Sequence, residues 1–319
     1  MSAEPNVPEP HPPCPVTGEP ALRLVQWVSA RLLIDLWRHT FRVDVRPSFR
    51  GTRRFGLWES PTGLYFFDPM RQGDAGFYTS LYARLNIRHY PREGHPRAEY
   101  RLAARAVAPG QRVLDVGCGF GAFRHEVPHA RYTGLDPHFS GEPGADWARI
   151  ETLGDHLVSH AGAYDVCTAF QVLEHVEEPV AMVAEMVRAV RPGGRVILGV
   201  PHVPAAHTRL PNYLINAVPH HLTWWTKDAL VAVAHRAGLV NPRVETAPWA
   251  DVDGLIYWME RCSPVKARAR HYRHAWSWHA SALIGFLGGY VMWKLRPVPK
   301  ARRGDEGASL LLVADKPAA

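Results

Sequence analysis

Cysteines and long apolar runs are both scarce in this sequence. Only four of the 319 residues are cysteine, and they stand far apart, without a Cys-x-x-Cys pair. Such usage argues against a disulfide-stapled secreted domain and predicts a reducing compartment. The opening of the chain lacks the basic and then apolar pattern of a secretion signal, and no segment is repeated. We therefore expect a cytoplasmic protein.

Positive charge predominates, but no nucleic-acid motif accompanies it. The net charge is +7 and the sequence pI is about 9.4, which suits an acidic partner such as a nucleic acid, a phosphorylated glycan or an anionic membrane surface. No basic stripe follows a recognisable DNA- or RNA-binding pattern. We expect no nucleic-acid partner, and charge alone does not choose between the other two.

The first third of the chain is predicted to be an appendage to the main domain. Residues 1–20 are rich in proline, which disfavours helices and central strands, so we expect an extended tail. Residues 21–95 are predicted to form a helical and aromatic subdomain. Its expected elements are a helix from Ala21 to His39, small strands between Phe41 and Pro69, and a helix from Tyr78 to Tyr90.

Beyond residue 96 strand and helix patterns alternate, which is typical of a parallel sheet wrapped by helices. This α/β pattern predicts one domain over residues 96–319. Strands are expected over 112–116, 131–135, 147–152, 164–170, 195–200, 240–246 and 308–314, and helices over 97–107, 178–190 and 226–237. Thr226 is suited to cap the last of these helices.

The most informative segment runs from Val113 to Gly121, where an apolar strand meets a glycine turn. Glycines at 117, 119 and 121 permit positive φ angles and let backbone N–H groups approach a ligand. The helix expected next would add its positive N-terminal end. A dinucleotide site partly fits the same pattern. Asp115 favours a different cofactor, because its carboxylate would pair with a cationic amino group and repel a pyrophosphate.

At these residues the sequence resembles the class I S-adenosylmethionine-dependent methyltransferases, and a second likeness lies in Leu173-Glu174-His175-Val176. The resemblance implies a Rossmann-like α/β fold, with a seven-stranded mixed sheet and helices on both faces, and S-adenosyl-L-methionine as cofactor. It also implies O- or C-methylation of a small-molecule, glycan or lipid-linked acceptor. A NAD(P)-dependent oxidoreductase and a pseudoenzyme that binds cofactor without turnover remain the alternatives.

The resemblance further implies which residues bind the cofactor. Asp136, followed by Pro137, would accept the ribose hydroxyls, although an acid there also suits a turn. Asp155 would face the adenine, in competition with Glu151. Two residues at a strand end would line the methionine part. The expected cofactor set is Asp115, Gly117, Cys118, Gly119, Gly121, Asp136, Pro137, Asp155, Phe170 and Gln171.

Histidines carry the predicted chemistry. His175, beside Glu174, is suited to remove a proton near neutral pH; the alternative is a helix-start histidine that only bonds to neighbouring loops. A later histidine-rich loop would bind substrate or be a plain surface loop. The expected substrate residues are His202, His220, His221 and Tyr82. No metal is expected, because the side chains of adjacent His220 and His221 tend to diverge and no cysteine has zinc spacing.

The N-terminal subdomain resembles a zinc ribbon that has lost its ligands. The segments Cys14–Gly18 and Glu59–Pro69 are similar to the two knuckles of the ribbon on many related bacterial methyltransferases, but the Cys-x-x-Cys pairs are gone. One thiolate without partners cannot close a zinc site. We therefore predict a metal-free remnant that packs through Trp58, Tyr65, Phe66 and Phe67.

A long insertion over about 250–306 separates the last two predicted strands. Its middle, Ala280 to Trp293, is apolar on every side and too short to span a bilayer comfortably, and basic residues flank it over 266–303. Two roles are open. The segment is either a buried lid over the substrate pocket or an interfacial helix in peripheral contact with anionic lipid.

Overall fold

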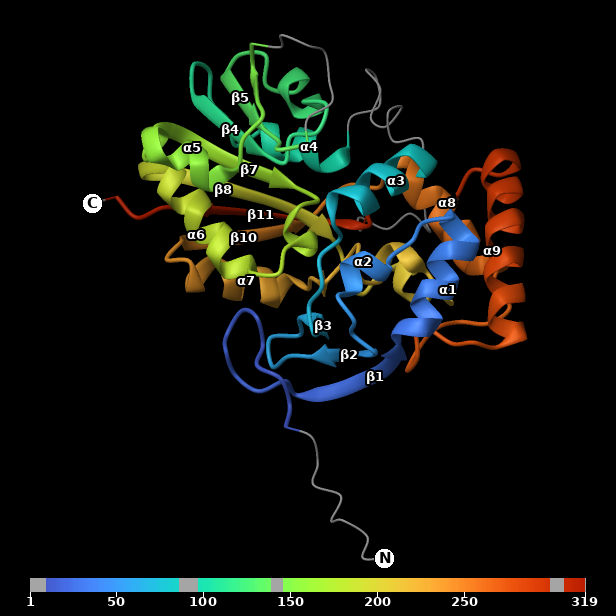
Figure 1. Ribbon diagram of the computed structural model, residues 1–319. Helices are drawn as coiled ribbons and strands as arrows, with labels where there is room; N and C mark the ends of the chain where they lie inside the picture. Colours follow the sequence, from blue (N-terminus) through green and yellow to red (C-terminus); the bar gives the residue numbers. More distant parts are fainter. Residues whose placement is uncertain (1–9, 86–96, 139–145, 299–306, 319) are drawn as a thin grey trace, which may run out of the picture.

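The computed structural model describes residues 10–85, 97–138, 146–298 and 307–318. Seven strands form its larger sheet: β4 (Arg112–Val116), β5 (Arg131–Leu135), β6 (Ala148–Arg149), β7 (Tyr164–Phe170), β8 (Val190–Pro201), β10 (Val240–Thr246) and β11 (Ser309–Asp315). Their order is β10-β11-β8-β7-β4-β5-β6 (Figure 1). Strands β8 to β6 run parallel, whereas β11 is antiparallel to β8 and β10. The predicted seven-stranded mixed sheet is confirmed.

Helices cover both faces of this sheet. One face carries α5 (Leu153–His160), α6 (Pro179–Ala189) and α7 (Lys227–Arg236), and the other carries α4 (Ala98–Ala104). Successive residues of a strand point to opposite faces, so Leu114 of β4 packs toward α5–α7 while Val113 packs toward Tyr100 of α4. Thr226 caps α7 as predicted, because its side chain accepts a hydrogen bond from the backbone N–H of Ala229 at 3.2 Å.

A second, four-stranded antiparallel sheet contains β1 (Arg23–Ser29), β2 (Arg54–Glu59), β3 (Tyr65–Asp68) and β9 (Thr223–Trp224). The expected helix from Ala21 to His39 is therefore wrong in its first half, and α1 occupies only Ala30–Phe41. Residues 23–29 pair with β2 instead, and this long-range pairing overrides the helical spacing of the apolar residues. The small strands expected between 41 and 69 are confirmed, with the short α2 (Arg46–Phe49) before them.

Other expected elements differ in length. Helix α3 covers Ala75–Leu85, and the remainder of the helix expected up to Tyr90 lies outside the described residues. The strand expected over 147–152 is reduced to the two residues of β6, because Thr152 already caps α5. From residue 10 onward the proline-rich segment is not an extended tail: Cys14 is buried, and its N–H donates to the carbonyl of Glu19 at 2.7 Å.

The two knuckle-like turns persist without ligand cysteines. The backbone N–H of Val16 donates to Cys14 Sγ at 3.4 Å, and that of Leu64 donates to Ser60 Oγ at 3.1 Å. Three of the four aromatic residues expected to pack this region are buried and the fourth is half-buried: Trp58, Phe66 and Phe67, and Tyr65. Hydrogen bonds thus hold the turns that cysteine-bound zinc would hold in the zinc ribbon they resemble. The metal-free state of this subdomain remains a prediction.

The insertion forms two packed helices, α8 (Asp251–Cys262) and α9 (Trp276–Leu295). They approach closely, since a Cβ at Gly289 of α9 would lie 2.6 Å from the Cα of Met259 in α8.

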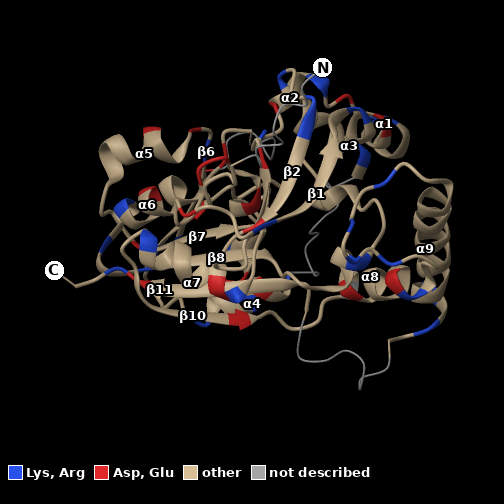
Figure 2. Cartoon of the chain, turned by 90° about the horizontal axis from the view of Figure 1, so that it is seen from below, with Lys and Arg blue, Asp and Glu red and all other residues tan. Residues whose placement is uncertain are grey.

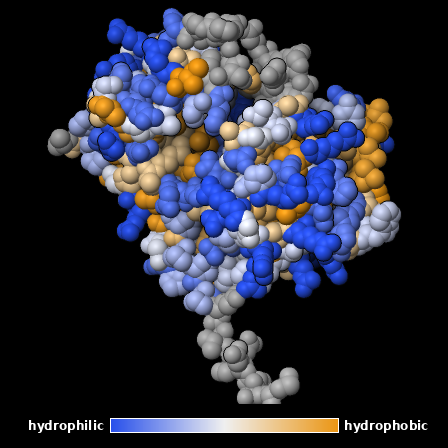
Figure 3. All heavy atoms as spheres, viewed as in Figure 1, coloured by the Kyte–Doolittle hydropathy of each residue, from blue (hydrophilic) through white to orange (hydrophobic). Residues whose placement is uncertain are grey.

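The opposite face of α9 is open to solvent and contains Leu283, Ile284, Phe286, Leu287, Tyr290, Val291 and Leu295, each about half exposed or more. Figure 3 shows this face as an orange strip. The outer face of α9 is therefore not buried, and a role of the insertion as a lid stays a prediction. None of the helices described is long and apolar enough to cross a bilayer.

Candidate functional site

The glycine turn after β4 borders open space at one position. Gly117, Gly119 and Gly121 all have positive φ, at 68°, 52° and 67°. A Cβ at Gly117 would meet Val172 at 2.5 Å and one at Gly121 would meet Trp147 at 2.4 Å, so neither position accepts a side chain. Among the described residues, nothing lies within 4 Å of a Cβ placed at Gly119. Close packing therefore holds the ends of the turn, and its middle is left accessible to a ligand.

The helix expected after this turn is wrong. Only a four-residue 3-10 turn, Ala122–His125, follows Gly121. Pro128 disfavours a helical conformation at the residue before it, and the buried ring of Phe123 fixes the turn against the sheet. A single 3-10 turn contributes little of the helix dipole that was expected to support the cofactor.

Asp115 is built into the sheet rather than presented to solvent. Its carboxylate is buried; Oδ2 accepts a hydrogen bond from the hydroxyl of Tyr132 at 2.6 Å, and Oδ1 accepts one from the hydroxyl of Thr168 at 2.8 Å. Burial raises the pKa of Asp115 to about 6. The neighbouring Cys118 is also buried, and burial raises the pKa of its thiol, so it carries no thiolate at neutral pH.

Asp136 joins the end of β5 to the glycine turn. Its Oδ2 accepts a hydrogen bond from the N–H of Gly119 at 3.0 Å, and its Oδ1 accepts one from the N–H of His138 at 2.8 Å. Pro137 beside it is exposed. The structure thus brings together the acid and the accessible glycine, as the sequence predicts.

Three other predicted cofactor residues are engaged elsewhere. Asp155 is exposed and accepts a hydrogen bond from the Thr152 hydroxyl at 2.6 Å, so it forms part of the α5 cap. The ring of Phe170 packs between two core aromatic rings, both 4.8 Å away between centroids. Gln171 Nε2 donates to Glu99 Oε1 at 3.2 Å. Their contacts with a cofactor remain predictions.

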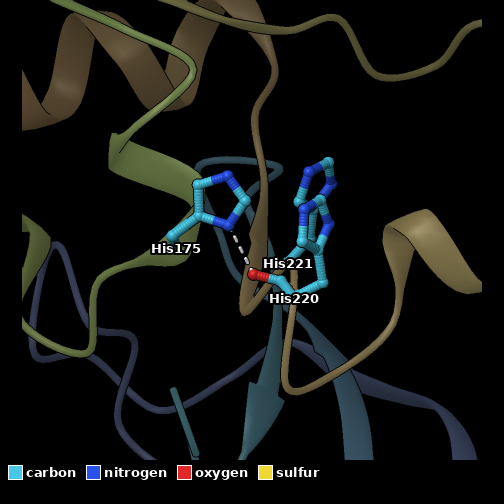
Figure 4. Close-up of side chains that lie close together, drawn as sticks. All are labelled: His175, His220 and His221. Atoms are coloured by element: carbon cyan, nitrogen blue, oxygen red, sulfur yellow. Dashed lines mark hydrogen bonds between the residues drawn. The ribbon is translucent and has the colours of Figure 1, made fainter. Parts of the chain in front are cut away.

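Three histidines from distant segments meet beyond the end of β7 (Figure 4). His175 ends the 3-10 turn Leu173–His175, and its Nδ1 donates to the carbonyl of His220 at 2.6 Å. The His175 ring lies 4.5 Å from that of His220 and 4.9 Å from that of His221. The expectation that adjacent histidines diverge is wrong here. Their rings stack at 4.5 Å with planes 18° apart, because the loop before β9 buries both.

Glu174 is the most enclosed ionisable group of this region. It is 0% exposed, and neither carboxylate oxygen has a hydrogen-bond partner among the described residues. Its Oε1 lies 3.8 Å from His175 Nε2. Burial disfavours both charged forms, which raises the pKa of Glu174 to about 8 and lowers that of His175 to about 4. At neutral pH both groups are therefore largely uncharged.

Tyr78 of α3 also lies beside His175, although it was not predicted as a site residue. Its ring meets His175 edge-on at 5.9 Å, and its buried hydroxyl has no hydrogen-bond partner within the described part of the chain. Tyr82, one helical turn later, was predicted to contact substrate. Desolvation, followed by the charges of Glu174 and Asp136, raises the pKa of Tyr82 to about 12. The spacing of four residues, which puts both rings on one helix face, was the available signal for Tyr78.

His202 lies apart from this ring arrangement, at the end of the extended β8 segment. Its N–H donates to the carbonyl of Ala308 at 2.8 Å, and its carbonyl accepts a hydrogen bond from His207 Nε2 at 3.0 Å. These bonds explain its burial as a structural residue. Its contact with substrate remains a prediction.

Comparison with known proteins identifies the class. A model of the "Methyltransferase domain" family matches residues 86–243. The ubiquinone biosynthesis O-methyltransferase of Cronobacter sakazakii is 31% identical over 183 residues, covering 46% of this chain and 74% of that protein. The protein with the same name from Xanthomonas axonopodis pv. citri is 32% identical over 195 residues, covering 54% and 75%. A methyltransferase structure from Archaeoglobus fulgidus, 15% identical, covers 69% of this chain and 92% of its own, with a TM-score of 0.44.

The chain therefore belongs to the class I S-adenosylmethionine-dependent methyltransferases. S-adenosylmethionine is its methyl donor, as the resemblance at the glycine turn implied. The alternative of a nicotinamide-dependent oxidoreductase is wrong.

Proposed function

We propose that this enzyme methylates an oxygen atom of a lipid-linked small molecule, which it meets at a membrane surface. The names of the relatives in Cronobacter and Xanthomonas favour an O-methyl product. The observation that carries the proposal for the reaction is the enclosed pair of Glu174 and His175 beyond the end of β7, near the glycine turn. The observation that favours a lipid-linked acceptor is the open apolar face of α9.

The cofactor is proposed to lie against Gly119 and Asp136. Space beside Gly119 fits a close approach of ligand to backbone, and the Asp136 carboxylate can exchange one of its two N–H partners for the ribose hydroxyls. Asp115 already accepts two hydrogen bonds, but a carboxylate has about four acceptor sites, which leaves capacity for an amino group. S-adenosylmethionine supplies a methyl group that its sulfonium has already activated.

His175 is proposed to remove the acceptor's proton. Donation from Nδ1–H to the His220 carbonyl leaves Nε2 as the basic atom. An imidazolium formed there would be stabilised by the Glu174 carboxylate, 3.8 Å from Nε2. The neutral hydroxyl of Tyr78, which has no described partner, is available to orient the acceptor.

Replacing Asp136 with alanine should weaken binding of S-adenosylhomocysteine by roughly 10- to 100-fold, because hydrogen bonds to a charged group contribute about 1.5–3 kcal/mol. Isothermal titration calorimetry measures this affinity. Asp165→Asn is the control, since Asp165 pairs with Arg112 and Arg191 at the far ends of the strands. Unchanged affinity in Asp136→Ala would contradict the proposed cofactor position. An equally large loss in Asp155→Ala would support its adenine contact.

The face of α9 combines exposed apolar side chains with positive charge at both ends. Figure 2 shows the helix nearly free of charged residues, with basic chain segments near its ends. The exposed cations are Arg268, Arg270 and Arg273 before the helix and Lys294 and Arg296 at its C-terminal end. Lysine and arginine stems can lie along an apolar surface while their charges reach anionic headgroups. This complementarity favours an anionic lipid surface over a second copy of the chain, which would carry the same positive charge.

The double variant Leu283→Ser with Leu287→Ser should bind anionic phosphatidylglycerol vesicles about tenfold more weakly. Burying the exposed apolar surface of these two leucines in the membrane should contribute about 1–2 kcal/mol to the binding free energy. Vesicle flotation measures the binding. The matched control is Leu22→Ser with Val158→Ser, two exposed apolar residues outside α9. Equal flotation of both double variants would contradict the membrane role. A dimer that only the α9 variant dissociates would point to a second copy of the chain instead.

A further inference from the structure

The ring nitrogens of His175, His220 and His221 lie close enough together to share one ligand. One ligand atom from each lies within 4.8 Å of the other two. His175 and His220 have the same hydrogen-bond pattern. Nδ1 of His175 donates to the backbone carbonyl of His220 at 2.6 Å, and Nδ1 of His220 donates to the backbone carbonyl of Ile215 at 2.8 Å. A carbonyl only accepts, so Nε2 of both rings keeps its lone pair. Metal-binding histidines show this pattern because the second nitrogen is anchored.

A second, independent observation is the set of unpartnered polar atoms around the rings. Both carboxylate oxygens of Glu174 and the hydroxyl of Tyr78 are buried without a hydrogen-bond partner among the residues described. Glu174 is fully buried and adjoins His175, and the Tyr78 ring lies 5.9 Å from that of His175. Buried polar groups normally have partners. Three such atoms beside three clustered imidazole rings indicate a bound polar ligand.

We propose that His175, His220 and His221 bind one divalent transition-metal ion, best matched by Zn²⁺, with a fourth position open to the acceptor oxygen. Imidazole ligands suit Zn²⁺ better than Mg²⁺ or Ca²⁺, which prefer oxygen. Three protein ligands and an open position are the usual arrangement of a catalytic zinc site. The nearby Glu174 carboxylate would balance part of the ion's charge.

The spacing of the three rings is close to that of a zinc site. Tetrahedral Zn²⁺ at about 2.0–2.1 Å from each nitrogen places the nitrogens about 3.3 Å apart. Because the ligand atoms lie within 4.8 Å of one another, side-chain rotation needs to bring any pair closer by at most about 1.5 Å.

The role of the ion rests on the proposed function. An acceptor hydroxyl at the open position would lose its proton to Glu174 in its charged carboxylate form, which becomes the neutral carboxyl. Its oxygen would then bond to the methyl carbon, and the methyl–sulfur bond would break with its electron pair left on sulfur. In this state His175 Nε2 is a ligand, and Glu174 takes over the role of base.

The test uses the full-length chain without an affinity tag, stripped with a chelator and dialysed. Calorimetric titration with Zn²⁺ should show one site per chain, and Co²⁺ should give the absorption bands of a tetrahedral nitrogen site. His220→Gln and His221→Gln should each weaken Zn²⁺ binding by more than about 100-fold, since even outer partners of metal ligands contribute 10- to 100-fold. His207→Gln is the matched control, because His207 is buried in the same loop with both ring nitrogens already bonded.

Surface binding must be separated from the buried site. His274 and His279 form an exposed pair with ring nitrogens 3.2 Å apart, so His279→Gln should leave the titration unchanged. Zn²⁺ binding that survives both loop variants, or that only His279→Gln removes, would overturn the proposal. Binding of S-adenosylhomocysteine in chelator is measured in parallel. If it persists in the His221→Gln variant, loss of Zn²⁺ reports on the metal site and leaves the methyltransferase function intact.

Discussion

The His175→Ala variant is expected to lose turnover by a factor of about 10² to 10⁴, the usual contribution of a positioned acid or base, while its affinity for S-adenosylhomocysteine stays within about threefold. The loss follows whether Nε2 accepts the proton or binds a metal ion, because both roles need the same lone pair. Steady-state kcat and calorimetric affinity, measured on one preparation, separate chemistry from binding. His160→Ala, an exposed histidine on α5, is the control. Full turnover in His175→Ala would remove both roles.

The pH dependence of turnover should report on Glu174. Its pKa of about 8 means that the carboxylate gains its charge only as the pH approaches that value. A charged carboxylate is needed to stabilise an imidazolium at His175 or to take a proton itself, so kcat should rise with pH up to about 8 and then level off. Glu174→Gln should abolish this rise. A rise that persists unchanged in the variant would mean that another group titrates.

The Trp37→Ala variant is expected to lower the free energy of unfolding by about 3–5 kcal/mol, the range for removing a buried tryptophan. Trp37 of α1 is 0% exposed, and its Nε1 donates to the carbonyl of Val218 at 3.0 Å. The ring packs against Phe77 of α3. Urea unfolding measures the change. Trp37→Phe should cost less, because most of the packing remains and one hydrogen bond contributes about 0.5–1.5 kcal/mol.

A matched surface variant makes this result interpretable. Trp276→Ala removes a tryptophan that is 85% exposed and should shift the unfolding free energy by less than about 0.5 kcal/mol. A single shared transition in Trp37→Ala would show that the first ninety residues unfold with the sheet domain. Two separate transitions, with only the first displaced, would contradict the contact between α1 and the segment around Val218.

The strands of the larger sheet could be predicted because local sequence determines them. Residues 112–116, 131–135, 164–170 and 240–246 are strands with the expected bounds. Residues 112–116 and 164–170 are short, mainly apolar runs, whereas 131–135 and 240–246 are more polar and follow from the alternation of strand and helix patterns. Residues 23–29 could not be predicted this way. Their apolar spacing suits a helix, and only the distant strand β2, which lies against them in space, decides the outcome.

The sequence could predict which candidate site residues lie close together where they follow the ends of neighbouring strands. It could not do so where long loops bring the residues together. Asp136 and Gly119 meet because β4 and β5 are adjacent parallel strands. The stacking of His220 on His221 depends on how a long loop is buried, which no local pattern encodes. Asp155 was predicted to face the adenine in competition with Glu151, and its place in the cap of α5 was not predicted.

Strand β9 has a consequence for attempts to shorten this enzyme. The N–H of Phe67 in β3 donates to the carbonyl of Leu222 at 2.9 Å, and the N–H of Leu222 donates to the carbonyl of Glu174 at 2.8 Å. Backbone hydrogen bonds thus connect the N-terminal sheet to the proposed reaction centre. A version trimmed to the seven-stranded core would keep every strand of that sheet and still lose the scaffold that seats its histidines.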